Sequence, residues 1–226
     1  MKLARPDVFH PRIVLAGSPQ HPGGAADDAG LVTALRRRGL HARWSSWDDP
    51  ETARADLVIL RVGREYARRA DEFLAWTTRM GNLLNPRPAV AWNLAARYLD
   101  DLAAAGVPTL PAGTSADPVA LTFFGGEQSH AFTGAHAVEP EFEVWDVGHA
   151  ALAAAAERAG IVTSELLYAR VDVDGDRVAR LDVVAPPLGW RRLDPAARES
   201  AQRRFAVAVE SACERLGLGP FSHRGP

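Results

Sequence analysis

The residue types that could do chemistry gather in the second half of the chain. Arg170 and Asp172 are two positions apart in one predicted strand, so their side chains share a face of its sheet. Asp182 lies in the segment that a turn pairs with this strand, and it can sit opposite the other two. The three charged groups could line a cleft. The alternative is a structural ion pair between neighbouring strands.

A serine beside a histidine, at Ser129 and His130, suggests a nucleophile with its base. Because adjacent residues on a strand point to opposite faces, we expect that these two side chains cannot act on each other. A structural or substrate-contacting His130 is the favoured interpretation. Glu127 and His130 make no recognisable metal motif. The catalytic residues stay open, with His130, Asp172 and Asp182 as candidates.

The first half of the chain alternates between strand and helix. Strands are predicted over 12–17, 41–47 and 55–62, and helices over 29–40 and 65–80. This alternation predicts a parallel sheet, in which ligands bind beyond the carboxyl ends of the strands. Arg61 lies at such an end and is a candidate anion contact. Its alternative is a surface arginine paired with Glu65 or Asp71.

A compact stretch over 85–111 follows. The apolar run 88–92 predicts a buried strand, and Asn93 can cap the helix after it. Gly106 stands where a helix C-terminal cap belongs, and 107–110 predicts another strand. A glycine pair at 23–24 lies in an early loop, but no phosphate-binding glycine motif is present there.

After residue 111 the pattern becomes antiparallel. Strands are predicted over 120–124, 129–133, 142–147, 166–173 and 178–184, with helices over 149–159 and from Pro195 onward. The last helix is expected to bury Ala201, Phe205, Val209, Ala212 and Leu216. The fold class is therefore α/β: a parallel-sheet half followed by an antiparallel α+β half. We expect two domains, over 1–111 and 112–226.

The composition fits an ordinary globular protein. The chain has 226 residues, of which 47% are hydrophobic and 24% charged, with a net charge of −2. That charge gives no electrostatic case for nucleic acid or an anionic membrane. Cys213 has no partner for an internal disulfide. No apolar stretch is long enough to span a bilayer and the N-terminus has no signal-peptide core, so a cytoplasmic protein is expected. The only lysine is Lys2.

An ordered set of short segments resembles the ATP-grasp superfamily, in particular its small carboxylate–amine and peptide ligases. The set covers nearly the whole chain and includes Trp92-Asn93, 98–109, 129–132, 168–172 and 182–186. The resemblance implies an N-terminal pre-ATP-grasp domain, a lid that supplies a lysine for the phosphates of ATP, and a C-terminal α+β domain. It also implies paired acidic residues that hold Mg²⁺ in the C-terminal domain.

The sequence departs from that pattern in three ways. Pro111 runs within a few residues into the strand at 120, where the family has its lid. No lysine is present to take the lid's role, apart from Lys2 near the N-terminus. Asp182 remains at the expected metal site, but Arg180 and Ala185 stand where further acids belong, and an arginine opposes Mg²⁺ binding. Asp182 serves Mg²⁺ only if Asp172 or a phosphate joins it.

Three hypotheses follow. The first is a degenerate, lid-less pseudoenzyme that needs no cofactor and binds an amino-acid-like or carboxylate small molecule, or a protein partner, in a biosynthetic pathway. Its expected ligand contacts are Arg61, Tyr66, Asn93, His130, Arg170 and Asp172. The second is an ATP-independent enzyme that cyclises or hydrolyses an amino-acid derivative in the same cleft. The third is a compact working ligase that uses ATP and Mg²⁺.

The expected loss of the lid also predicts a homodimer or a partner subunit. Removing the lid should expose the surface around 111–124, where Phe123 and Phe124 stand next to the cut. An exposed apolar surface of this kind favours cover by a second chain.

Overall fold

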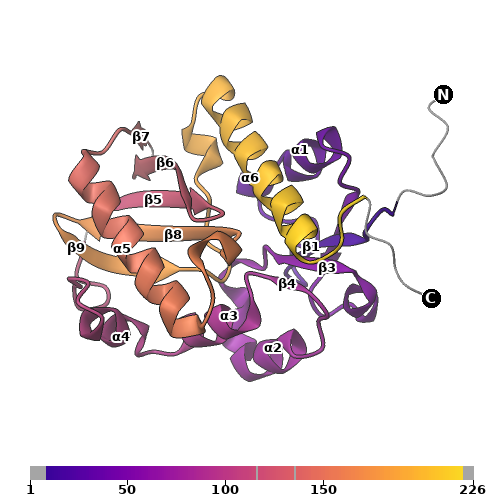
Figure 1. Cartoon of the computed structure of the whole chain (residues 1–226), viewed down its shortest axis with the longest axis horizontal. Coiled ribbons are helices and arrows are strands. Elements are labelled where there is room, and N and C mark those ends of the chain that lie inside the picture. The colour runs from indigo at the N-terminus through magenta and orange to yellow at the C-terminus, as the bar shows by residue number, and fades with distance from the viewer. Residues whose placement is uncertain (1–8, 116, 135, 221–226) are drawn as a thin grey trace.

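A computed structural model describes residues 9–115, 117–134 and 136–220 (Figure 1). Its first sheet has four parallel strands in the order β2-β1-β3-β4, and its second has five antiparallel strands in the order β7-β6-β5-β8-β9. The strands are β1 (Ile13–Gly17), β2 (Ala42–Ser46), β3 (Leu57–Leu60), β4 (Leu83–Leu84), β5 (Val119–Phe124), β6 (Glu127–Thr133), β7 (His136–Val138), β8 (Tyr168–Asp174) and β9 (Arg177–Asp182). The predicted fold class is confirmed.

Six α-helices in the described residues pack around the two sheets. They are α1 (Leu31–Arg37), α2 (Ala70–Thr77), α3 (Arg87–Leu94), α4 (Tyr98–Ala104), α5 (Phe142–Ala159) and α6 (Pro195–Arg215). The chain also forms short 3₁₀ turns, which are η1 (Ala26–Asp28), η2 (Pro50–Arg54), η3 (Gly63–Arg69), η4 (Thr163–Glu165) and η5 (Trp190–Arg192). In Figure 1, α5 crosses one face of the five-stranded sheet and α6 stands between the two sheets. No helix in the described part of the chain is long and apolar enough to cross a membrane.

The two sheets are joined by a buried polar contact around Tyr168. The Tyr168 hydroxyl lies 2.7 Å from the carbonyl oxygen of Leu60 in β3 and 2.9 Å from that of Val184, which follows β9. The Asn85 amide, directly after β4, donates to the carbonyls of Tyr168 and Val183, each at 2.7 Å. Because buried polar groups must find partners, these bonds fix the position of one sheet against the other.

The apolar cores do not separate at residue 111. Ala89 and Leu102, from α3 and α4, pack with Leu121 of the five-stranded sheet. Phe205 of α6 packs with Ile13 of the parallel sheet. The division into domains over 1–111 and 112–226 stays a prediction.

The prediction of a strand over 88–92 is wrong, because these residues belong to α3. Pro88 lies in the first turn of that helix, where its missing N–H is not needed. Asn93 therefore does not cap a following helix. It lies inside α3, and its side chain bonds the backbone of Leu181 and Val183.

A second strand prediction, over 142–147, is also wrong, because this segment forms the start of α5. Its alternating apolar residues continue directly into the alanine-rich run that ends at Gly160, whose φ of 69° terminates the helix. At the other end of the second half, Leu216 is 40% exposed rather than buried, because it lies beyond the last turn of α6.

The apolar surface expected beside the missing lid is not exposed. Phe123 is 0% and Phe124 is 4% exposed. The ring of Phe123 packs edge-on against Trp145, and that of Phe124 packs against Phe205. Helices α5 and α6 of the same chain therefore cover both rings, and this reason for a dimer does not hold.

Candidate functional site

The candidate site is a cavity of about 410 Å³ beyond the parallel sheet, lined by Asp27, Gly134, Pro187, Arg191 and Arg192. The loop after β1 supplies Asp27, and the η5 segment supplies the two arginines. The Asp27 carboxylate accepts the backbone N–H groups of Gly189 at 2.8 Å and Arg191 at 3.1 Å. These bonds tie the two loops together across 162 and 164 positions of sequence.

The two arginines give the cavity its positive charge. Arg192 donates from Nε to the Gly134 carbonyl at 2.6 Å, and its guanidinium lies 4.6 Å from the ring centre of Phe132. The exposed Arg191 side chain makes no ion pair with any described residue. A guanidinium fork binds a carboxylate or phosphate well. The sequence predictions missed both arginines, although they follow a Pro-Pro-Leu-Gly turn at 186–189 beside the strand that carries Asp182.

Arg61 is buried rather than exposed to a ligand. Its side chain is 3% exposed and bonds the Asp28 carboxylate, which is 2% exposed, at 2.6 and 2.9 Å. Burial opposes the charge on Arg61, but Asp28 outweighs that effect and raises the pKa of the guanidinium. The sequence predicted that Arg61 contacts an anion or forms a surface pair with Glu65 or Asp71. The buried pair with Asp28 matches neither prediction. It holds the loop after β1 against β3.

The charged residues of β8 and β9 neutralise each other. Arg170 pairs with Asp182 and Asp172 with Arg180 in the strand register, so the four residues share the sheet face away from α5. Arg170 donates to the Asp172 carboxylate at 2.6 Å, and Arg180 donates to Asp182. The other Asp182 oxygen accepts two backbone N–H groups, at 3.1 and 3.3 Å. The contacts favour the structural ion-pair alternative, with pairs along each strand rather than across strands.

This donor set does not fit the Mg²⁺ of the ATP-grasp family. Asp172 and Asp182 each hold a guanidinium where a divalent ion would need a free carboxylate. Among the described residues, no group of three or more His, Cys, Asp or Glu side chains could hold a metal ion.

Ser129 and His130 do meet, which corrects the expectation that they cannot act on each other. Ser129 Oγ lies 3.0 Å from His130 Nδ1. The register of β5 with β6 pairs Thr122 with His130 but Phe123 with Gln128, so Ser129 is an extra residue in a β-bulge. A bulge interrupts the alternation of side chains, which the sequence pattern does not reveal.

His130 is fixed from its other side as well. Its Nε2 lies 2.7 Å from the Leu188 carbonyl, which only accepts hydrogen bonds. Nε2 therefore carries the proton, and the neutral ring leaves Nδ1 free to accept from Ser129. Burial lowers the pKa of His130, although the Leu188 carbonyl partly offsets this effect. Both residues line a cavity of about 520 Å³ together with Arg204.

The remaining predicted contacts lie in the core or beside it. Asn93 is 8% exposed and is occupied by the β9 backbone. The Tyr66 ring stacks on Phe73 at 5.0 Å in the apolar cluster behind β3. The cavity of about 520 Å³ that contains His130 is not lined by Arg61, Tyr66 or Asn93, and their role as ligand contacts stays a prediction.

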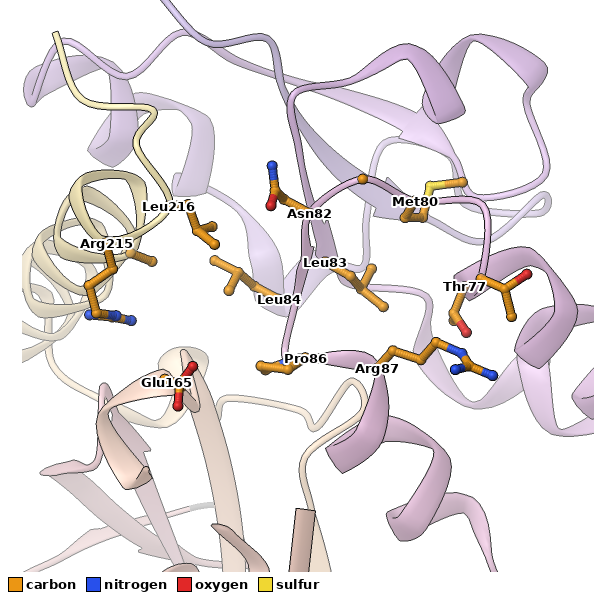
Figure 2. Close-up of a pocket in the computed structure, with 13 residues that line it drawn as sticks. Thr77, Met80, Asn82, Leu83, Leu84, Pro86, Arg87, Glu165, Arg215 and Leu216 are labelled. Atoms are coloured by element: carbon orange, nitrogen blue, oxygen red, sulfur yellow. The ribbon is translucent and has the colours of Figure 1, made fainter. Parts of the chain in front are cut away.

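A separate cavity of about 340 Å³ lies between β4, η4 and the end of α6 (Figure 2). Its lining includes Leu84, Pro86, Arg87, Glu165 and Arg215. None of the residues predicted as a site from the sequence lines it. The same is true of the cavity at Arg191 and Arg192. We place the candidate site at Arg191 and Arg192 because the Asp27 carboxylate fixes that loop from the other end of the chain, which leaves an exposed guanidinium at a held position.

The fold is that of the ATP-grasp ligases, as the sequence resemblance implies. The crystal structure of D-cycloserine synthetase DcsG matches with a TM-score of 0.71 and 24% identity, over 90% of this chain and 99% of that chain. The ATP-grasp ligase PsnB, complexed with a precursor variant, Mg and ADP, matches with a TM-score of 0.56 and 16% identity. That match covers 90% of this chain and 99% of the PsnB chain. D-alanine–D-alanine ligase from Bacillus anthracis, complexed with ATP, matches with a TM-score of 0.56 and 11% identity. That match covers 91% of this chain and 98% of the ligase chain.

The sequence comparisons are more specific for the first half. Residues 13–85 match the family model of the D-cycloserine synthetase DcsG N-terminal domain. The cycloserine biosynthesis protein DcsG of Streptomyces lavendulae is 40% identical over 86 residues. That match spans 36% of this chain and only 29% of the relative.

Proposed function

We propose that this protein is a lid-less relative of the ATP-grasp ligases that binds an amino-acid-like or carboxylate small molecule in a biosynthetic pathway. The observation that carries this proposal is the pair Arg191 and Arg192 at the cavity of about 410 Å³. In parallel sheets of this kind, ligands bind beyond the carboxyl ends of the strands. The cavity lies at that position, next to the loop that follows β1.

The chain's own geometry supports loss of ATP binding in the family manner. Only seven residues separate Pro111 from the first residue of β5, Val119, which is too short for a lid domain. The acids of the metal position, Asp172 and Asp182, are held by arginines of their own strands. The small-ligand function therefore needs neither ATP nor Mg²⁺ as a cofactor.

The relatives suggest the class of ligand. The match to the family model, over 13–85, falls on the half that supplies the Asp27 loop. The name of that family model refers to cycloserine, a small amino-acid-like compound. We infer that the half that supplies the Asp27 loop of the cavity has been kept while the ATP-handling parts have been lost. We also infer that the protein acts as a homodimer or beside a partner subunit.

Two measurements test this function. Titration of ATP with Mg²⁺ into the protein should give no saturable heat, whereas saturable Mg²⁺-dependent binding would restore the ligase hypothesis. A panel of amino acids and cycloserine, screened by thermal shift, should contain a compound that raises the melting temperature.

Variants then locate the ligand. The double variant Arg191→Ala/Arg192→Ala should lose the shift, because it removes both cavity guanidiniums. Arg36→Ala is the matched control, since that exposed arginine of α1 does not line this cavity. If the double variant and wild type respond equally, the ligand binds elsewhere and the proposed site is wrong.

A second candidate function is ATP-independent hydrolysis or cyclisation of an amino-acid derivative. It is favoured by the 3.0 Å contact between Ser129 and His130. In such a reaction Ser129 Oγ would attack an acyl carbon while His130 Nδ1 takes its proton, and the protonated ring would then return that proton to the leaving group. Water, or an amine of the same molecule, would release the acyl group.

A fluorophosphonate probe distinguishes this second function from simple binding. The probe should label the wild-type protein and fail to label Ser129→Ala, and His130→Gln should slow the labelling strongly. Ser164→Ala provides a control serine in η4, which does not line the cavity that contains His130. Absence of labelling in the wild type would leave the binding function as the proposal.

A further inference from the structure

The first turn of α5 carries an exposed aromatic ring among unpaired acids. Phe142 is 71% exposed, more than any other large apolar side chain in the described part of the chain. Four exposed acids accompany it, and none makes an ion pair with a described residue; they are Glu139, Glu141, Glu143 and Asp146. We refer to Phe142 and these four residues as the acidic knob.

The exposed face of α6 carries the opposite arrangement. A cavity of about 390 Å³ runs between α6, the β5–β6 turn and η4. Phe124, Gly125, Val207 and Ala208 give it apolar walls, and Val207 is 41% exposed. Three exposed arginines stand along it, at Arg203, Arg204 and Arg215. We refer to these seven residues as the arginine groove.

The three arginines have no carboxylate partner among the described residues. Arg204 donates to the Ser129 carbonyl at 2.6 Å, and Arg215 donates to the Ser164 carbonyl at 2.9 Å. No hydrogen bond joins the Arg203 side chain to a described residue. One acid, Glu127, also lines the groove. The groove therefore keeps an excess of positive charge around its apolar walls.

We propose that the acidic knob of one copy of this chain docks in the arginine groove of a second copy. The aromatic ring of Phe142 supplies the kind of anchor that carries most of the binding energy at interfaces. The acids around it would meet the arginines around the apolar walls, which gives complementary charge and a defined orientation. This contact pairs four acids and three arginines that make no ion pair with a described residue of their own chain.

The positions of the two surfaces indicate a closed dimer. Helices α5 and α6 both lie on the side of the molecule that faces the viewer in Figure 1. Because the helices that carry the knob and the groove lie on one side, a twofold axis can place each knob in the partner's groove at the same time. The dimer would thus use the arginine groove, of which Phe124 forms part of the wall, and not Phe123, which is 0% exposed.

The test is the oligomeric state in solution. Light scattering and sedimentation should show a monomer–dimer equilibrium when the protein concentration is varied up to about 0.1 mM. Phe142→Asp should raise the dissociation constant roughly 30-fold or more, the effect of losing a central aromatic anchor. Raising salt from about 0.1 to 0.5 M should weaken the dimer, because exposed charges are screened.

Charge variants make the test specific to this surface. Arg203→Glu should weaken the dimer, and adding Glu143→Arg to it should restore part of the affinity. Arg43→Glu makes the same change of charge on β2, at the far edge of the parallel sheet, and should leave the dimer intact. A monomer at every concentration, or a dimer that Phe142→Asp leaves unchanged, would overturn the proposal.

Discussion

The two sheets use charge in different ways. Beyond the parallel sheet, Asp27 and Asp28 bond groups far away in sequence, at Gly189, Arg191 and Arg61. In the antiparallel sheet, Asp172 and Asp182 bond arginines two positions away in the same strand. The first pattern holds loops around a cavity whose own arginines stay available. The second pattern neutralises Asp172 and Asp182 locally, so neither is a free carboxylate for a metal ion.

Under the proposed function, this difference would let one fold lose one function and keep another. A metal site needs several free carboxylates in one place, so a single arginine on each strand is enough to remove it. A cavity for a small anion needs only fixed loops and accessible cations. The loops at Asp27 and Arg191 meet both of these conditions.

Breaking the long-range pair should have the largest effect. Asp28→Ala leaves the Arg61 guanidinium buried without its carboxylate, which should cost about 3–5 kcal/mol of the free energy of unfolding. Urea denaturation of wild type and variant measures this loss. Arg37→Ala is the control, because its pair with Glu199 is 65% and 70% exposed and should contribute at most about 1 kcal/mol. Equal losses in both variants would contradict a special role for the buried pair.

Breaking the local pairs should change the response to metal. The double variant Arg170→Gln/Arg180→Gln frees two carboxylates that are each 7% exposed. It should lose about 2–3 kcal/mol of stability, and Mg²⁺ should recover part of this loss because it replaces the missing positive charge. Thermal unfolding with and without Mg²⁺ measures the recovery. A wild-type protein that Mg²⁺ stabilises equally would show that the arginines do not block the site.

The hydrogen bonds of the Tyr168 hydroxyl, which join the two sheets, should contribute less to the free energy of unfolding than the two ion-pair arrangements. Tyr168→Phe removes only the hydroxyl and leaves the buried carbonyls of Leu60 and Val184 without that donor. This should cost about 1–2 kcal/mol, within the usual penalty for an unsatisfied buried group. Urea denaturation measures the loss, with circular dichroism as the control for an unchanged fold. A neutral substitution would mean that packing alone sets the position of the sheets.

The sequence predicted regular elements better than it predicted contacts. The parallel strands followed from apolar runs bounded by turns, and the last helix from Asp194, whose side chain accepts two N–H groups at its start. The strands predicted over 88–92 and 142–147 are helical, because the pattern of a short apolar run is the same in a buried strand and in a helix.

The candidate site was less predictable for a different reason. The contact of Ser129 with His130 depends on a bulge, and the pair of Asp28 with Arg61 joins residues 33 positions apart. The same holds for Arg191, whose backbone reaches Asp27 across 164 positions. Tertiary structure alone brings such residues together, whereas Arg170 and Asp172 could be placed on one face from their spacing.

Protonation of His130 should have the smallest effect on the free energy of unfolding. Burial lowers its folded pKa below the unfolded value of about 6.5, so acidification protonates the unfolded chain first. The free energy of unfolding should fall as pH drops through 6.5 towards the folded pKa, and the loss is complete below that pKa. One site contributes a slope of at most about 1.4 kcal/mol per pH unit.

His130→Gln isolates this contribution. The variant keeps all other titrating groups, so the difference in unfolding free energy between it and wild type should narrow from pH 8 to pH 5, because only the wild type pays the cost of protonating His130. Urea denaturation across this range measures the slope. Parallel curves for the two proteins would mean that His130 titrates alike in the folded and unfolded chains. Burial would then not favour the neutral ring, although the Leu188 carbonyl would still place the proton of that neutral ring on Nε2.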